Sequence, residues 1–351
     1  MEDATDTTAA EAAGPAHSPK ARARKSGSKQ LHAGVDLGGT KIQVAVLRDQ
    51  EIAGSSRVPT PQTDADDVIA AIIQAVKDSL TEAGAAPGDL AAVGIGTPGE
   101  IDADKGEVSL ANNVPGFIDP PVPLGPKVSD ALGGVTVKVN NDVRVAILGE
   151  FERGAGRPYT NFLGVFVGTG VGGGLILDGK LRTGRGAAGE IGHTVVKPGG
   201  RECACGRKGC LEAYAGRARL ELRARELHDK GEKTDLFKLM RERGRDRLTA
   251  GVWHRAARNE DKLALELIER AEEAIAAAAA SAVNLLDVEA VILGGGMGTR
   301  FGEEARARIE KAMLPHVFND DRPPAVLLAE LGDLGGALGA ALLVEERAKT
   351  A

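Results

Sequence analysis

The sequence predicts an α/β protein whose two lobes flank a cleft. With 351 residues, the chain exceeds the size at which a single hydrophobic core usually stops growing. A strand, a glycine-rich turn and a second strand begin near His32, and the same pattern returns near Phe162. Segments with helical periodicity alternate with further strands in both halves. We therefore expect each lobe to hold its own sheet with covering helices.

The first lobe is predicted from alternating strand and helix signals. The expected elements are strands at 32–37 and 42–47, a third strand after the turn at 48–50, a helix at 64–83, strands at 90–95 and 135–139, and a helix from Asp142 to about Arg153. Gly84 stands where a helix commonly ends in a left-handed residue.

The second lobe is expected to start like the first. Its predicted elements are a strand at 162–167, the glycine run 168–174, a strand at 175–177 with an Asp178-Gly179 turn, helices at about 211–227 and 262–286, a strand at 290–293 followed by glycines 294–296, and a closing helix from about Gly335. We place residues 31–140 and 335–351 in a smaller lobe and residues 141–334 in a larger one.

The composition favours a small solute over nucleic acid or a membrane as partner. The net charge is -6, and no run approaches the roughly 18 apolar residues that span a bilayer. Residues 1–30 lack the apolar run of a secretory signal and hold little to bury, so we expect a disordered tail on a cytoplasmic protein. The role of its basic stretch, Lys20 to Lys29, stays open.

Glycine-rich turns early in each lobe are candidate phosphate sites. The segment from Gly34 to Lys41 is not a Walker A loop, because Thr40 and Lys41 stand in reverse order and a strand follows. The stretches 94–99 and 168–173 match the letters of the dinucleotide-binding fingerprint, but neither begins a helix within a βαβ unit. A nicotinamide-dependent enzyme is therefore a weak alternative. Two such turns could hold one polyphosphate through their backbone amides, although each alone could be an ordinary tight turn.

Four residues have the spacing of a metal site. His193, Cys203, Cys205 and Cys210 supply one imidazole and three thiols, a set suited to a closed, tetrahedral structural zinc site. Three cysteines in so short a segment make a poor disulfide framework, and free reduced thiols are the alternative. Asp142 also has two interpretations, because an aspartate at a strand-to-helix junction can be a helix cap or a catalytic carboxylate.

Six motifs together resemble the repressor/ORF/kinase (ROK) family. They are Asp36-Leu-Gly-Gly-Thr-Lys41, Gly94-x-Gly96-x-Pro98-Gly99, Asn141-Asp142, the glycine run 168–174, Glu190-Ile-Gly-His193 and Cys203-x-Cys205-Gly-x-x-Gly-Cys210-Leu-Glu212. The resemblance implies the actin-like fold of sugar kinases and the Hsp70 ATPase domain, which is ribonuclease H-like. It also implies ATP-dependent phosphorylation of a hexose.

The resemblance assigns a role to each matching position. Asp142 would be the catalytic base, and Asp36 would hold Mg²⁺ through water. The implied sugar contacts are Asn113, Asn141, Asp142, Glu190, His193 and Glu212. The implied nucleotide and phosphate contacts are Asp36, Gly38, Gly39, Thr40, Lys41, Gly168, Thr169, Gly170, Gly295 and Gly296. The implied structural zinc ligands are His193, Cys203, Cys205 and Cys210.

The leading hypothesis is a glucokinase that transfers the γ-phosphoryl group of ATP to the 6-hydroxyl of glucose. One alternative keeps the kinase but changes the sugar to N-acetylmannosamine, N-acetylglucosamine, fructose or mannose, or changes the donor to polyphosphate. Another is a sugar-responsive repressor, although such members carry an N-terminal winged helix-turn-helix and only about thirty polar residues precede the fold here. The family also implies a homo-oligomer, a dimer or tetramer.

Overall fold

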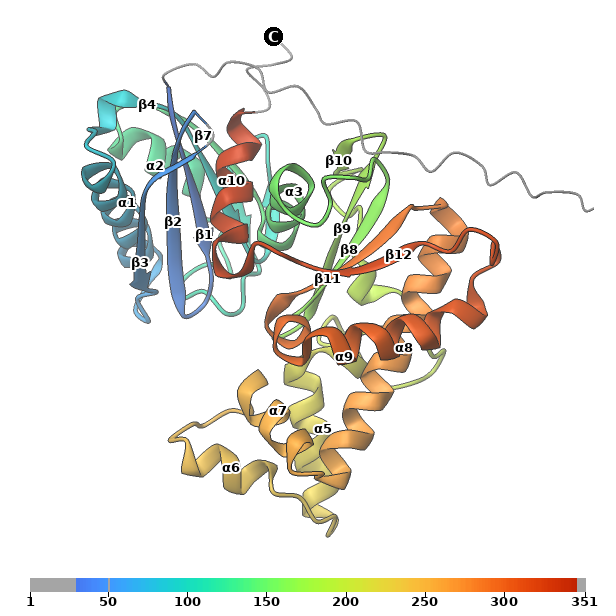
Figure 1. The fold of residues 1–351 in the computed structure, drawn as a ribbon. Helices are drawn as coiled ribbons and strands as arrows, with labels where there is room; N and C mark the ends of the chain where they lie inside the picture. The colour runs from blue at the N-terminus through green and yellow to red at the C-terminus, as the bar shows by residue number, and fades with distance from the viewer. Residues whose placement is uncertain (1–29, 50, 346–351) are drawn as a thin grey trace, which may run out of the picture.

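The computed structural model describes residues 30–49 and 51–345 and contains two five-stranded sheets that lie side by side (Figure 1). Helices cover both sheets, so the predicted α/β class is confirmed. Nearly all of the predicted disordered tail, residues 1–30, lies outside the described residues.

The first sheet has the strand order β3-β2-β1-β4-β7, with β1, β4 and β7 parallel and β1, β2 and β3 joined as antiparallel hairpins. Helices α1 and α2 lie on one face and α10 on the other (Figure 1). The elements from the start of the chain to α3, together with the closing helix, are β1 (Leu31–Leu37), β2 (Lys41–Arg48), β3 (Glu51–Pro59), α1 (Ala65–Glu82), η1 (Pro87–Asp89), β4 (Leu90–Thr97), β5 (Glu100–Asp102), β6 (Glu107–Ser109), α2 (Leu124–Ala131), β7 (Thr136–Asn141), α3 (Asp142–Arg153) and α10 (Gly335–Glu345).

The second sheet has the order β10-β9-β8-β11-β12, again with antiparallel hairpins followed by parallel neighbours. Its elements are β8 (Phe162–Val167), β9 (Val171–Leu177), β10 (Lys180–Arg182), η2 (Ile191–His193), α4 (Glu212–Ala215), α5 (Arg217–Asp229), α6 (Leu236–Glu242), α7 (Ala250–Arg258), α8 (Lys262–Leu286), β11 (Ala290–Gly294), α9 (Gly295–Met313), η3 (Leu314–His316), β12 (Ala325–Leu328) and η4 (Gly332–Leu334). Helices α5, α6 and α7 extend away from the sheets (Figure 1).

Helices α3 and α10 lie between the sheets and pack closely because glycines face them (Figure 1). A Cβ atom on Gly94 of β4 would lie 1.8 Å from the carbonyl oxygen of Ala340, and one on Gly339 would lie 1.6 Å from that of Val145. A Cβ atom on Gly96 would lie 2.4 Å from Cγ2 of the Val145 side chain. The glycine pattern that resembled a dinucleotide fingerprint therefore positions helices.

Several predicted boundaries hold, and their geometry explains them. Gly84 has a φ of 66°, as expected for the residue after a helix. Asp178 and Gly179 have positive φ angles of 55° and 69°, as a two-residue type I′ hairpin turn requires.

The prediction of one helix at 211–227 is wrong, because the chain breaks at Gly216 between α4 and α5. A Cβ atom there would lie 3.3 Å from Gly170, so the break lets the glycine turn at 168–170 approach. Strand β9 also begins at Val171 and not at Leu175, because Gly172 and Gly174 lie against Val143 and Ile147 of α3. Helices α2, α6, α7 and α9 were not predicted.

Within the described residues, no helix combines the length and the apolar character that crossing a membrane requires.

Candidate active site and metal centre

A cavity of about 650 Å³ lies where the carboxyl ends of strands from the two sheets meet. In open α/β sheets, ligands bind at this end of parallel strands. From the first sheet and its helices come Asp36, Lys41 and Asp142, and from the start of α9 come Gly295 and Gly296. The other lining residues are Val143, Ala146, Glu150, Phe166, His254, Thr299, Arg300, Ala329, Gly332, Asp333, Gly335 and Gly336.

Asp142 is the first residue of α3, and its neighbour Asn141 is the helix cap. The Asn141 Oδ1 atom accepts hydrogen bonds from the backbone amides of Val143 and Arg144 at 3.0 and 3.2 Å. Asp142 Oδ1 accepts one from Val143 at 2.9 Å, and no hydrogen bond to Asp142 Oδ2 is present within the described chain. The cap role that competed with catalysis for Asp142 is thus filled mainly by Asn141.

The environment of Asp142 raises the proton affinity of its carboxyl group. Burial raises the pKa of its carboxyl group, and the negative charge of Glu190 adds to that rise, while the backbone hydrogen bond from Val143 opposes it. A carboxylate with a raised pKa accepts a proton more readily near neutral pH.

Asp36 lies at the end of β1 and faces the same cavity. Burial, with a further contribution from the Asp142 charge, raises the pKa of Asp36 to about 6, and Lys41 opposes the shift. A Cβ atom on Gly336, in the first turn of α10, would lie 2.7 Å from Asp36 Cγ, so only glycine allows this carboxyl group to pack against the helix. Lys41 forms an ion pair with Asp333 at 3.1 Å on the cavity wall.

The turn at Gly38 to Thr40 has its carbonyl oxygens occupied by protein donors. The Thr60 hydroxyl donates to the Gly38 oxygen at 2.6 Å, the Gln62 amide donates to that of Gly39 at 3.0 Å, and the Thr60 backbone amide donates to that of Thr40. The Gly38 amide donates to the Lys41 oxygen at 3.0 Å, so the amides of Gly39 and Thr40 are the candidates in this turn to face an anion. Neither Gly38, Gly39 nor Thr40 lines the cavity itself.

The turn at Gly168 to Gly170 has a matching arrangement. The backbone amides of Arg217 and Ala218, at the start of α5, donate to the oxygens of Gly168 and Thr169. The Arg217 side chain donates to the Thr169 hydroxyl at 2.8 Å. These residues are also absent from the cavity lining, but Gly295 packs against Val167 directly before them.

The residues predicted to contact sugar lie around these turns. Glu190 forms an ion pair at 3.1 Å with Arg144, whose Nη2 atom also donates to the Gly186 oxygen. Glu212 Oε2 accepts the Val171 amide at 2.9 Å and lies against Gly170, while its Oε1 atom accepts from Cys203.

Asn113 and His193 complete this group. A Cβ atom on Gly39 would lie 2.3 Å from the Asn113 carbonyl oxygen, so Asn113 adjoins the first turn. His193 is exposed on η2. The cavity lining includes neither of these two residues, nor Glu190 or Glu212.

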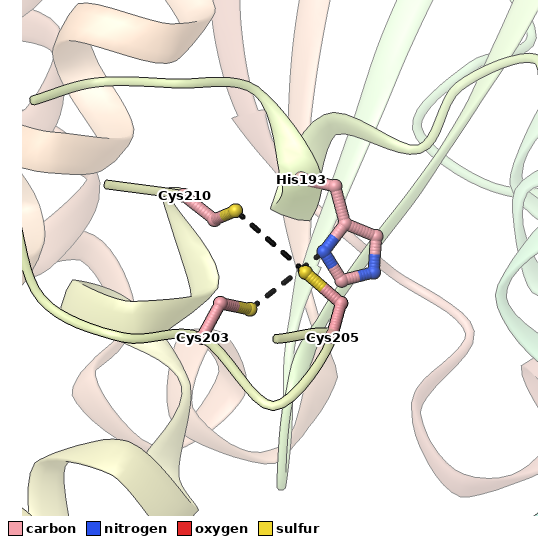
Figure 2. A group of neighbouring side chains, drawn as sticks. All are labelled: His193, Cys203, Cys205 and Cys210. Carbon is pink, nitrogen blue, oxygen red and sulfur yellow. Dashed lines mark hydrogen bonds between the residues drawn. The ribbon is translucent and has the colours of Figure 1, made fainter. Parts of the chain in front are cut away.

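The predicted metal ligands meet in one cluster, in which His193, Cys203, Cys205 and Cys210 point toward a common centre (Figure 2). Their ligand atoms all lie within 4.8 Å of one another. Cys203 Sγ is 3.8 Å from His193 Nδ1, and Cys205 Sγ is 3.9 Å from Cys210 Sγ. Ligand atoms around a tetrahedral zinc ion are separated by about 3.8 Å, whereas disulfide sulfur atoms are separated by about 2.05 Å. The donor set and its spacing therefore fit zinc.

Sequence reasoning missed the residues that position the site. Arg144 is buried in α3 and Glu150 is buried nearby, where Glu150 accepts the backbone amides of Ala155, Glu330 and Leu331 at 3.0, 3.1 and 2.9 Å. Charged residues in a helix usually lie on its solvent-exposed face, so the sequence gives no reason to single out Arg144 and Glu150. Only their burial in the structure distinguishes them from exposed charges. Thr60, Gln62 and Arg217, which contact the two glycine turns, belong to no motif that the sequence analysis recognised.

Comparison with known proteins identifies the family. The ROK family model matches residues 32–347. The chain belongs to the ROK family. A glucokinase from Thermotoga maritima is 33% identical over 321 residues, covering 90% of this chain and 97% of that protein. An N-acetyl-D-glucosamine kinase from Haemophilus influenzae is 30% identical over 331 residues, covering 89% of this chain and 99% of that protein.

The fold also matches solved ROK structures. The crystal structure of a ROK family glucokinase from Streptomyces griseus in complex with glucose and AMPPNP matches with a TM-score of 0.74 and 34% identity, over 90% of this chain and 99% of that chain. The ROK protein therefore has the actin-like, two-lobed kinase fold.

Proposed function

We propose that this ROK protein is an ATP-dependent sugar kinase that phosphorylates the 6-hydroxyl of a hexose, with glucose as the leading substrate. The observation that carries the proposal is the shared cavity, which Asp36 and Asp142 line from the first sheet and Gly295 and Gly296 line from the second half. Similarity to glucokinases over nearly the whole chain supports glucose.

Asp142 takes the proton of the sugar hydroxyl in this proposal. Its Oδ1 atom is held by the Val143 amide, so Oδ2 is directed to the hydroxyl. The oxygen that loses the proton attacks the γ-phosphorus of ATP, the bond from that phosphorus to the β,γ-bridging oxygen breaks, and ADP leaves. Correct placement of these groups supplies much of the rate acceleration.

The remaining predicted residues orient the two substrates. Gly38, Gly39, Thr40 and Lys41 hold phosphates from one side, and Gly168, Thr169 and Gly170 from the other, while Gly295 and Gly296 adjoin the adenosine. Asp36 would hold Mg²⁺ through water, and the ion would neutralise phosphate charge. Asn113, Asn141, Glu190, His193 and Glu212 contact the sugar hydroxyls.

A structural zinc ion held by His193, Cys203, Cys205 and Cys210 would order the sugar side of the site. Protein ligands would fill all four positions of a tetrahedral ion, so the ion would have a scaffolding role. Glu212 follows the proposed ligand Cys210 by two positions in the chain, and its Oε2 atom adjoins the glycine turn at Gly170. The metal cluster thereby links the acceptor site to the donor site.

We further propose that the kinase works in the cytoplasm as a homodimer or homotetramer without binding nucleic acid. Phe318 and Leu285 are 92% and 82% exposed, and apolar side chains of this size support a subunit interface. Light scattering on the purified protein tests the assembly.

A coupled assay of ADP release over a panel of hexoses and N-acetylated sugars tests the proposed activity. Glucose should give the highest kcat/KM. The similarity to an N-acetylglucosamine kinase favours that sugar as the second candidate. Repeating the assay with polyphosphate as donor tests the phosphate source, and turnover of no sugar at all would contradict the kinase assignment.

A further inference from the structure

The chain passes between the two sheets through two short connections. Helix α3 leads from β7 of the first sheet to the first connection, residues 154–161, which enters β8 of the second sheet. The second connection, residues 329–334, leads from β12 back to α10, which covers the first sheet (Figure 1). A change in the angle between the sheets must be absorbed at or near these connections, because loop and element-terminal residues take up hinge motion while packed elements move as units.

Glu150, near the end of α3, holds both connections. Its Oε2 atom accepts the backbone amide of Ala155 in the first connection at 3.0 Å and that of Glu330 in the second at 3.1 Å. Its Oε1 atom accepts the backbone amide of Leu331 at 2.9 Å. Gly154 leaves room for the carboxyl group, since a Cβ atom there would lie 1.9 Å from Oε2. One side chain therefore joins α3 to two segments that lie far apart in the sequence.

The chemistry of Glu150 suits the holding of backbone amides. The residue is 2% exposed, and no lysine, arginine or histidine forms an ion pair with it among the described residues. Removing a carboxylate from water is costly unless strong hydrogen bonds compensate, and bonds from amides to a carboxylate are of that kind. A carboxylate only accepts, whereas a glutamine side chain would turn an NH₂ group toward some of the three amides.

The hydrogen bonds of Glu150 also connect two groups of the proposed active site. Asp142 is the first residue of the same helix, about two turns before Glu150. Directly after the second connection, Gly336 in the first turn of α10 packs against Asp36. Because Glu150 fixes α3 to the segment that leads into α10, it also fixes Asp142 relative to Asp36.

We propose that Glu150 is a positioning residue that sets the angle between the two sheets and thereby couples binding of the sugar to binding of the phosphate donor. The proposed sugar site takes Asn113 and Glu190 from opposite sides, and the donor cavity takes Asp36 and Gly296. A change in the angle therefore alters both sites together, which is the condition for coupling. The inference rests on the proposed kinase function, in which Glu150 itself transfers neither a proton nor a phosphoryl group.

Calorimetric titration of the variant E150Q tests the coupling without turnover. Glucose is titrated with and without a saturating non-hydrolysable ATP analogue and Mg²⁺, and N-acetylglucosamine replaces glucose if the ADP-release panel favours it. In the unmodified protein the analogue should tighten sugar binding at least about fivefold. In E150Q this factor should fall below about twofold, because glutamine leaves at least one of the three amides without an acceptor. Sugar affinity without the analogue should change less than about threefold.

The matched control is D261N. Asp261 is also buried and accepts two backbone amides, from Asp235 at 2.6 Å and Ala264 at 2.9 Å, but it joins the start of α8 to the segment before α6. D261N should lower the unfolding temperature and leave the coupling factor unchanged. Equal losses of coupling in E150Q and D261N would overturn the proposal, since the effect would then be a general loss of stability. Unchanged coupling in E150Q would overturn it as well.

A second variant removes a donor and leaves Glu150 in place. Leu331 has a φ of -79°, which proline can adopt, so L331P removes the amide that Oε1 accepts. L331A keeps this amide and controls for the loss of the leucine side chain. The coupling factor should be at least about twofold lower in L331P than in L331A. The same factor in both variants would count against a role for these hydrogen bonds in coupling.

Small-angle X-ray scattering of the ligand-free proteins gives a readout that needs no sugar. E150Q should shift to a larger radius of gyration, because the two sheets can then separate further, whereas D261N should keep the radius of the unmodified protein. An unchanged radius in E150Q would overturn the positioning role. A protein that shows coupling and loses it in E150Q but phosphorylates no sugar would overturn only the proposed function. Normal ADP release by an unmodified protein without coupling would overturn only this inference.

Discussion

Asp36 and Asp142 line one cavity from the same edge of the first sheet, Asp36 at the end of β1 and Asp142 directly after β7. The Asp142 charge raises the pKa of Asp36, which indicates that the two carboxyl groups are electrostatically coupled. Both groups must be ionised for their proposed roles, yet both are buried. A cation and a phosphate chain between them would relieve the conflict.

Replacing Asp142 with asparagine tests the base. The change keeps the size of the side chain and removes the ability to accept a proton. We expect kcat to fall by about 10² to 10⁴, as for loss of a general base, while sugar affinity stays within about threefold. Steady-state kinetics and calorimetric titration with glucose measure the two quantities.

The control for this prediction is D321N, which removes an exposed carboxylate far from the motif residues in sequence and should leave kcat unchanged. A D142N variant with near-normal kcat would place the base elsewhere. A variant that loses glucose binding together with turnover would instead make Asp142 mainly a sugar ligand.

Replacing Asp36 with asparagine should abolish most activity yet stabilise the free protein. The folded state raises the pKa of Asp36 from 3.8 to about 6, so above pH 6 the ionised side chain costs folding free energy. Asparagine removes that cost, and we expect about 1 to 3 kcal/mol of added stability at pH 8. The gain should shrink as the pH falls through 6 and vanish below about 4, because the carboxyl group is then neutral in both states.

Urea denaturation of both proteins at pH 8 and pH 4, without nucleotide or metal, measures this difference. The pH dependence of kcat/KM in the unmodified protein is a second readout, and it should decline as the pH drops below about 6. A D36N variant that is less stable at pH 8 would show that contacts of the carboxylate with α10 outweigh its burial.

Asp142 and the proposed metal ligands stood out in the sequence because each belongs to a compact motif, although the base role of Asp142 came from the family resemblance. Asn141-Asp142 follows a strand, and the three cysteines lie within eight positions, so local spacing was informative. Glu190 and Glu212 were found only through the family resemblance. Their partners, Arg144 and Val171, lie 46 and 41 positions away, and no local pattern reports contacts across such separations.

The glycines show a second limit of sequence reasoning. The spacing of Gly94 and Gly96 resembled that of a ligand-binding loop, but in the structure these glycines allow α10 and α3 to pack closely on β4. A glycine that admits a phosphate and one that admits a helix look alike until the neighbouring element is known. The same limit hid the break at Gly216, since helical periodicity continues through it.

Arg144 is expected to act as a positioning residue for Glu190. Its buried side chain donates to Glu190 at 3.1 Å and to the Gly186 oxygen at 2.6 Å. Substituting glutamine frees Glu190, so the KM for glucose should rise about tenfold while the KM for ATP changes less than about twofold. R223Q, which breaks the exposed Arg223 to Glu226 pair, is the control and should alter neither constant. Equal rises in both KM values would indicate a general loss of structure.

The metal cluster predicts about one zinc ion per chain by elemental analysis. Removing it with a chelator, or replacing Cys205 with serine, should lower the unfolding temperature and raise the KM for glucose more than that for ATP, because the proposed sugar contacts His193 and Glu212 are a ligand and a near neighbour of a ligand. Metal-free protein with unchanged stability and kinetics would disprove the structural zinc site.

A graded series of glycine-to-alanine variants tests whether helix packing sets the position of the site. A Cβ atom at Gly94 meets the backbone oxygen of Ala340 at 1.8 Å, so G94A should cost at least about 3 kcal/mol of stability or prevent folding. At Gly164 the Cβ atom meets only the Ile147 side chain at 2.5 Å, which can rotate, so G164A should cost about 1 to 3 kcal/mol. At Gly88 nothing lies within 4 Å, and G88A should be neutral or slightly stabilising.

Urea denaturation of the soluble variants ranks them by their free energy of unfolding. If G164A were as stable as G88A, Gly164 would not set the approach of α3 to the second sheet. If G94A were as stable as G88A, the close contact between α10 and β4 would not be needed to hold Asp36 in the cavity.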